Sequence, residues 1–66
     1  MRNLIYTILF EFFKDEESEG YSVVVPALPE IITWGRTLDE ARRNAVEAIQ
    51  CHVEGLLKDG DPIPSN

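Results

Sequence analysis

Two adjacent side chains of this 66-residue chain, Cys51 and His52, have the types that nucleophilic and acid-base catalysis use. A cysteine becomes a nucleophile beside a cation or a helix N-terminus, and a histidine becomes a general base when an acid orients it. Cys51 falls in the C-terminal half of a predicted helix, and no acid stands three or four residues from His52. We therefore interpret His52 as a packed or partly exposed histidine and Cys51 as a free thiol.

The carboxylates do not form a catalytic pair. Glu11 is the only acid within a predicted strand, whereas four others crowd one predicted loop: Asp15, Glu16, Glu17 and Glu19. Hydrolysis by paired carboxylates needs acids that converge at one place, and a loop cluster is typical of a solvated turn. A metal-dependent nuclease is the least favoured interpretation, because it would depend on Glu11 alone.

The sequence contains no pattern of metal ligands and no cofactor-binding motif. Cys51 and His52 lie about 100° apart around a helix, and no second Cys/His pair completes a tetrahedral site. No glycine-rich phosphate loop is present. We therefore predict no enzyme activity, no cofactor and no metal.

Length and charge narrow the function further. A chain of this size makes a single domain, residues 1–66, and buries too little surface to be more than marginally stable alone. The single cysteine excludes an intrachain disulfide and suits a reducing cytoplasm, so self-association is the remaining route to stability. Six basic and twelve acidic residues give a net charge of −6, which disfavours nucleic acid and favours a basic protein partner.

The apolar N-terminal run, MRNLIYTILFEFF, could be mistaken for a signal peptide. Thr7 and Glu11 interrupt it, and no small-residue cleavage site follows. It is also too short for a membrane span. We therefore expect a cytoplasmic protein without a membrane segment.

Three apolar runs rich in aromatic or β-branched residues predict strands over residues 4–13, 21–25 and 31–34. The polar segment KDEESEG joins the first two as a hairpin. Pro26 ends the second strand because it has no N–H to donate. The following segment, PALPE, forms either a plain turn stiffened by its prolines or a semi-rigid surface for a partner.

A helix is predicted over residues 38–58. Thr37 and Glu40 match a capping box, and Gly60 is a natural stop. Gly55 either marks a close backbone approach or is simply tolerated. The apolar stripe of this helix comprises Leu38, Ala41, Ala45, Ile49, Val53, Leu56 and Leu57. Beyond it, the prolines of the tail DPIPSN, residues 61–66, predict a short edge strand.

The order of elements predicts an α+β, two-layer β-β-β-α-β domain, in which an antiparallel three-stranded sheet carries one long helix on one face and a short terminal edge strand. Alternation puts Tyr6, Ile8, Phe10 and Phe12 on one face of the first strand and Ile5, Leu9 and Phe13 on the other. The sequence does not show which set faces the helix.

Whichever set it is, large apolar residues remain on the uncovered face, and exposed patches of that kind mark interaction sites. Trp34 either packs in the core or serves such an interface, where tryptophan is enriched. The candidate residues of a partner or oligomer interface are Ile5, Leu9, Phe13, Val24, Leu28, Glu30, Ile32 and Trp34.

Several of these segments together resemble the signature of HicB-like antitoxins. They are Gly20-Tyr21, the run VVVPALPE, the segment Gly35-Arg36-Thr37-Leu38-Asp39-Glu40-Ala41, and the tail Gly60-Asp61-Pro62-Ile63-Pro64. The resemblance spans residues 4–64. It implies a partial RNase H-like fold without the nuclease carboxylates, association into dimers or higher forms, and a role in binding and inhibiting a small basic mRNA-cleaving toxin, HicA.

Two departures limit what the resemblance implies. Glu30 stands where the family pattern has glycine, so a turn that relies on positive φ must either accept a strained glutamate or take another shape. Many HicB proteins also continue into a DNA-binding domain, which residues 1–66 do not contain, so operator binding is not implied. The alternative function is an orphan structural or regulatory module that associates only with itself.

Overall fold

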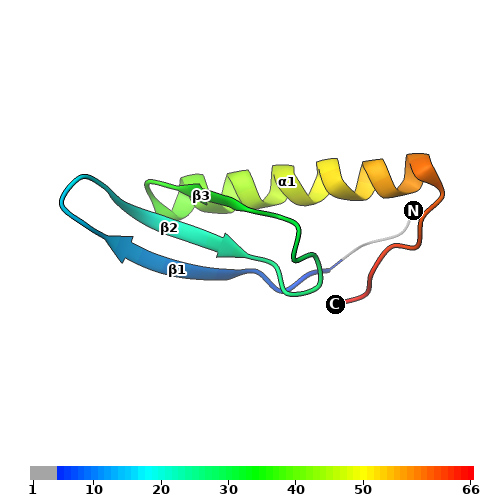
Figure 1. Cartoon of the computed structure of the whole chain (residues 1–66), viewed down its shortest axis with the longest axis horizontal. Coiled ribbons are helices and arrows are strands. Elements are labelled where there is room, and N and C mark those ends of the chain that lie inside the picture. Colours follow the sequence, from blue (N-terminus) through cyan, green and yellow to red (C-terminus); the bar gives the residue numbers. More distant parts are fainter. Residues whose placement is uncertain (1–4) are drawn as a thin grey trace.

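The computed structural model describes residues 5–66 and forms three strands and one helix in that part of the chain (Figure 1). The strands β1 (Leu9–Lys14), β2 (Glu19–Val24) and β3 (Thr33–Gly35) form an antiparallel sheet in the order β1-β2-β3. The helix α1 (Leu38–Asp59) lies along one side of this sheet. The predicted α+β class, one long helix on a three-stranded antiparallel sheet, is confirmed. Leu4, where the first strand was predicted to begin, lies outside the described residues.

The first strand is shorter than predicted because its partner ends early. Leu9 pairs with Val24 in the β1–β2 register, so the residues before Leu9 would have to pair with Val25 and Pro26. Pro26 has no N–H to donate, and the chain turns away there. Residues 5–8 therefore run beyond the paired part of the sheet.

Two successive turns fill the loop between β2 and β3. The N–H of Leu28 donates to the Val25 carbonyl at 2.9 Å, and the N–H of Ile31 donates to the Leu28 carbonyl at 3.1 Å. Each turn has a proline at its second position, where a fixed φ near −65° suits the geometry. Among the described residues only glycine has positive φ, so Glu30 occupies the third position of its turn without the strain that a type II turn would impose.

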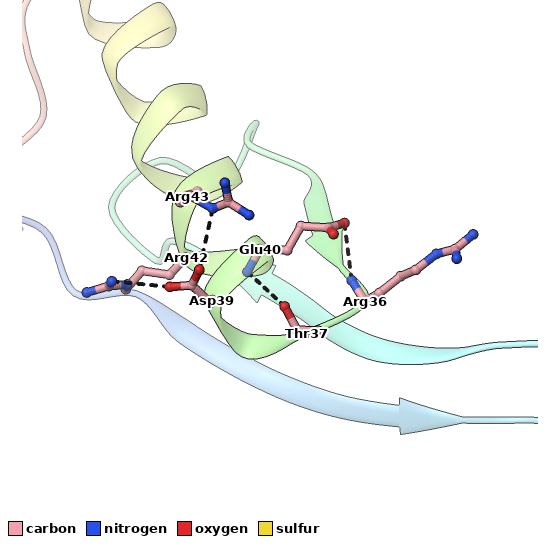
Figure 2. A network of polar contacts seen from close by, with 6 residues as sticks. All are labelled: Arg36, Thr37, Asp39, Glu40, Arg42 and Arg43. Carbon is pink, nitrogen blue, oxygen red and sulfur yellow. Dashed lines mark hydrogen bonds and ion pairs between the residues drawn. The ribbon is translucent and has the colours of Figure 1, made fainter.

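Side chains cap the first turn of α1 (Figure 2). The hydroxyl of Thr37 accepts the N–H of Glu40 at 3.1 Å, which is the first half of the predicted capping box. The carboxylate of Glu40 accepts the N–H of Arg36, at 3.3 Å, rather than that of Thr37. Asp39 lies 3.4 Å from Arg42 and 3.6 Å from Arg43, in ion pairs on the exposed side of the helix.

Gly60 ends the helix as predicted. It has a φ of 73°, and the N–H groups of Gly60 and Asp61 donate to the carbonyls of Leu57 and Leu56, which is a Schellman motif. The predicted terminal strand is wrong, since residues 61–66 form no strand in the described part of the chain.

The tail is held by side chains instead. The hydroxyl of Tyr6 donates to the carbonyl of Pro64, and the amide side chain of Asn66 makes two hydrogen bonds with Thr7. The N–H of Thr7 donates to Asn66 Oδ1 at 2.7 Å, and Asn66 Nδ2 donates to Thr7 Oγ1 at 2.9 Å. The tail thus lies beside Tyr6 and Thr7 and is held there by side-chain hydrogen bonds, without a backbone ladder.

The core forms between α1 and the sheet, and it consists of Val23, Val25, Leu28, Ile31, Ala41 and Ala45. Tyr6, Ile8 and Phe10 pack against it, so this set of the first strand faces the helix. Leu38 and Leu57, which belong to the predicted apolar stripe, are exposed. For Leu57 the reason is length, because a helix of 22 residues extends about 33 Å, whereas a six-residue strand spans about 20 Å.

Two glycines allow backbones to approach each other closely, one between α1 and β3 and one between β2 and the end of β3. A Cβ on Gly35 would lie 2.3 Å from the nitrogen and 2.7 Å from the Cα of Ala41, and a Cβ on Gly20 would lie 2.5 Å from the carbonyl oxygen of Gly35. Both clashes are with backbone, which cannot rotate away. Glycine at position 35 therefore permits the close approach of α1 to β3, and glycine at position 20 permits the close approach of β2 to the end of β3.

We predict that Gly35→Ala destabilises the chain by about 2 to 4 kcal/mol, because the added methyl group overlaps the backbone of Ala41. Gly55→Ala is the matched control. A Cβ on Gly55 meets nothing within 4 Å, so the same change there raises stability by up to about 1 kcal/mol. Urea unfolding followed by circular dichroism measures both. Equal stability of Gly35→Ala and the parent chain would contradict the close approach.

We also predict that Thr37→Ala lowers the free energy of unfolding by about 1 kcal/mol, because the N–H of Glu40 loses its acceptor. Thr37→Ser, which keeps the hydroxyl, should retain most of that stability. Thermal unfolding of the two variants side by side checks the cap, and an equal loss in both would show that the methyl group of Thr37 matters instead.

Candidate protein-binding surface

One face of the sheet has no described element over it. Leu9 pairs with Val24 and Ser22 pairs with Trp34, so these four side chains project to the same side, opposite to Phe10 and Val23, which pack in the core beneath α1. Phe13 and Ile32 share this side by alternation. We call the apolar residues of this side, Leu9, Phe13, Val24, Ile32 and Trp34, the outer face; Glu11 and Ser22 project to the same side between them. Its members are exposed apart from the half-buried Phe13.

Trp34 is the largest side chain of the outer face. It is 47% exposed, and its ring packs on that of Phe13 with a centroid separation of 5.9 Å and a tilt of 60°. A shallow pocket next to it is lined in part by Phe13, Ser22 and Ile32. An aromatic ring that a neighbour already orients loses little freedom on binding, which favours its use as an anchor for a partner.

The β1–β2 hairpin loop brings carboxylates to the rim of this face. Asp15, Glu16, Glu17 and Glu19 line a pocket that also includes Trp34 and Arg36. The carboxylate of Asp15 accepts the N–H groups of Glu17 and Ser18, both at 2.8 Å, and these two bonds lower the pKa of Asp15 from its ordinary 3.8. The stability that these two bonds contribute to the folded chain is present at pH values above the ordinary pKa of Asp15. It is lost as the pH falls through the lowered pKa of the folded state. The other carboxylates of the loop are exposed to a partner.

The structure brings together five of the eight predicted interface residues, namely the whole outer face. Ile5 is exposed, but it borders a groove beside α1 rather than that face. Leu28 has an exposed fraction of 0%, so its prediction as a surface residue is wrong. It stands at the corner shared by the two turns, which direct its side chain into the core.

Glu30 also lies away from the outer face. Its carboxylate contacts His52 Nε2 at 3.3 Å, which joins the loop between β2 and β3 to α1. Sequence reasoning missed this pair because it searched for an acid only along the helix that carries His52. The two residues are 22 positions apart, and no short-range pattern connects them.

The other residues considered for chemistry remain apart in the structure. Cys51 is exposed on α1, and Glu11 is exposed opposite Ser22. Within residues 5–66, no three His, Cys, Asp or Glu side chains come together as metal ligands. In the same part of the chain, α1 does not have the apolar length that crossing a membrane would require.

Comparison with known proteins identifies the family to which this chain belongs. The family described as "HicB_like antitoxin of bacterial toxin-antitoxin system" matches residues 6–66. The UPF0150 protein Ta0767 of Thermoplasma acidophilum is 47% identical over 60 residues, which is 89% of this chain and 81% of that protein. The UPF0150 protein ssr1765 of Synechocystis is 36% identical over 59 residues, which is 89% of this chain and 71% of that protein.

A third relative is longer. The 14.9 kDa protein of the rep-hol intergenic region of Haemophilus phage HP1 is 39% identical over 59 residues, and this chain covers 44% of its length. No solved structure matches the chain. The match over residues 6–66, together with the identity to the two UPF0150 proteins, shows that this chain belongs to the HicB-like antitoxin family of bacterial toxin-antitoxin systems.

Proposed function

We propose that this chain is a non-catalytic module that binds and neutralises a small basic, mRNA-cleaving toxin of the HicA type in the cytoplasm. Membership of the antitoxin family indicates a toxin-antitoxin role. The observation that carries the proposal further is the outer face, a row of exposed apolar side chains bordered by an acidic loop.

The apolar part supplies binding free energy. Leu9, Val24 and Trp34 are between 38% and 49% exposed, and Ile32 is 92% exposed, so a partner can remove much apolar surface from water. The surrounding backbone is already ordered by the sheet, which reduces the entropy lost on association. Trp34, held by Phe13, is the anchor of this surface in the proposal.

The acidic part supplies selectivity for a basic partner. A ribonuclease needs cationic residues to hold the phosphates of its substrate. Carboxylates of the hairpin loop can pair with the same cationic residues, so a bound antitoxin would compete with RNA for that surface. The net charge of −6 also speeds encounter with a basic protein through long-range attraction.

The alternative is a module that associates only with itself, in which the outer face covers a second copy. No specific contact favours that function over toxin binding. The two differ in their response to salt, because attraction between opposite charges weakens as salt is added, whereas repulsion between two acidic copies is relieved.

We predict that Trp34→Ala weakens binding to the short basic protein encoded beside this chain's gene by about tenfold or more. Leu57→Ala is the matched control, since Leu57 is 62% exposed but lies near the end of α1, away from the outer face. Calorimetric titration measures the affinities, and growth of cells that co-express the toxin measures neutralisation. Failure of the parent chain to bind or suppress this neighbour would refute the proposed function.

We further predict that the affinity for this toxin falls as salt is added. Glu16→Gln combined with Glu17→Gln should lower the association rate several-fold, because both carboxylates lie at the rim of the outer face. Glu54→Gln, which removes a carboxylate from α1, is the control and should change the rate little. Stopped-flow mixing at two salt concentrations gives the rates. A rate that does not depend on salt would exclude the electrostatic part of the proposal.

A further inference from the structure

Trp34 is the middle residue of β3, and its backbone groups point away from β2. The N–H of Asp15 donates to the Ser18 carbonyl at 2.8 Å, which makes these two residues a bonded pair at the end of the hairpin. Because bonded and non-bonded pairs alternate along an antiparallel ladder, even-numbered residues of β2 bond to β1 and odd-numbered ones bond to β3. In the β2–β3 register Trp34 faces the even-numbered Ser22. The N–H and C=O groups of Trp34 therefore point to the free edge of β3.

The side chain of Asn44 on α1 supplies a partner at this edge. Its Nδ2 atom donates to the carbonyl oxygen of Trp34 at 2.8 Å. Asn44 follows Ala41 by three residues, a spacing that puts both on one side of the helix, and the backbone of Ala41 is what a Cβ on Gly35 would meet. The close approach that Gly35 permits thus brings a short amide side chain within reach of the neighbouring carbonyl. Asparagine is a poorer helix former than alanine, so this tertiary contact is the gain that it brings to the middle of α1.

Trp34 is thus held at two points. Asn44 holds its carbonyl, and the ring of Phe13 packs on its indole at a centroid separation of 5.9 Å. β3 has only three residues, so few ladder bonds fix the position of its backbone. The indole is exposed on the outer face, whereas Asn44 reaches β3 from the helix that packs on the opposite side of the sheet (Figure 1).

We propose that Asn44 is a positioning residue for the anchor of the outer face: it fixes the backbone from which the indole of Trp34 projects and does not touch the partner itself. This role rests on the proposed function, in which Trp34 is that anchor. An anchor whose backbone is already fixed loses less freedom when a partner covers it. The hydrogen bond of Asn44 therefore adds to the affinity for a partner through Trp34.

The contact requires a short side chain with an N–H donor, which gives a sharp variant. Aspartate has the shape of asparagine but no donor when it is ionised, and at position 44 it would place a carboxylate beside the carbonyl of Trp34. Asn44→Asp thus removes the bond with little change in volume. Gln50→Glu is the matched control, because it makes the same chemical change and adds the same charge at an exposed position of α1.

Fluorescence tests the contact without any partner, because Trp34 is the single tryptophan of the chain. We expect Asn44→Asp to lower the fluorescence anisotropy of the indole and to raise its quenching by acrylamide at temperatures well below unfolding, whereas Gln50→Glu leaves both unchanged. Unchanged anisotropy and quenching in a folded Asn44→Asp chain would overturn the proposal. If that variant does not fold, the parent chain decides: side-chain amide protons of Asn44 that exchange with solvent as fast as those of Gln50 overturn it.

A double-mutant cycle tests the effect on binding to the short basic protein encoded beside this chain's gene. Asn44→Ala leaves the charge unchanged and should weaken binding by about two- to tenfold, the range that ordering one side chain costs on association. In the Trp34→Ala chain the same change should have no effect, because the anchor is already lost. An equal loss in both chains would show that Asn44 does not act through Trp34, which overturns the proposal.

Failure of the positioning role and failure of the proposed function give different results in calorimetric titration. A parent chain that does not bind the basic neighbour refutes the proposed function, and the fluorescence of the free chain then decides whether Asn44 holds Trp34. A parent chain that binds, together with an Asn44→Ala chain that binds equally well, refutes only the positioning role.

Discussion

The close contact between the first turns of α1 and the end of β3 is the constraint on which the rest of the structure depends. At Gly35 and Gly20 a single added carbon would meet backbone at 2.3 and 2.5 Å, so the helix, β3 and β2 meet with no side chain between them. Ala41 and Ala45, both fully buried, keep the helix near the sheet further along. Small residues on both sides of the interface thus allow a very short strand to hold a long helix.

This contact also decides what remains exposed. Because α1 packs mainly against β3 and β2, it covers neither the outer face nor Phe12 on the inner side of β1. Residues 5–66 contain no second helix to cover either surface, and exposed apolar patches of this kind usually mark interaction sites. The two surfaces differ in character. The outer face combines Trp34 with an acidic rim, whereas β1 presents open backbone and a phenylalanine.

Local chemistry made much of the fold predictable. The helix was expected over residues 38–58 and runs from Leu38 to Asp59, since the hydroxyl of Thr37 and the backbone freedom of Gly60 act within one turn of the helix. The strands were predicted in the correct order, but their limits were not. The start of β1 depends on where β2 stops pairing. The tail does not form the predicted strand, because side-chain hydrogen bonds with Tyr6 and Thr7 hold it instead of a backbone ladder.

The amino-acid sequence by itself determined the three strands of the sheet, the helix, their order, the acidic charge and the presence of more apolar sheet surface than one helix can cover. These properties follow from periodicity, capping and composition, which act over a few residues or over the whole chain at once. Only the tertiary structure decided that Tyr6, Ile8 and Phe10 face the helix, that Leu28 is buried, and that Glu30 meets His52. Alternation in a strand defines two faces but not which one is inside, because that choice depends on where a distant glycine lets the helix approach.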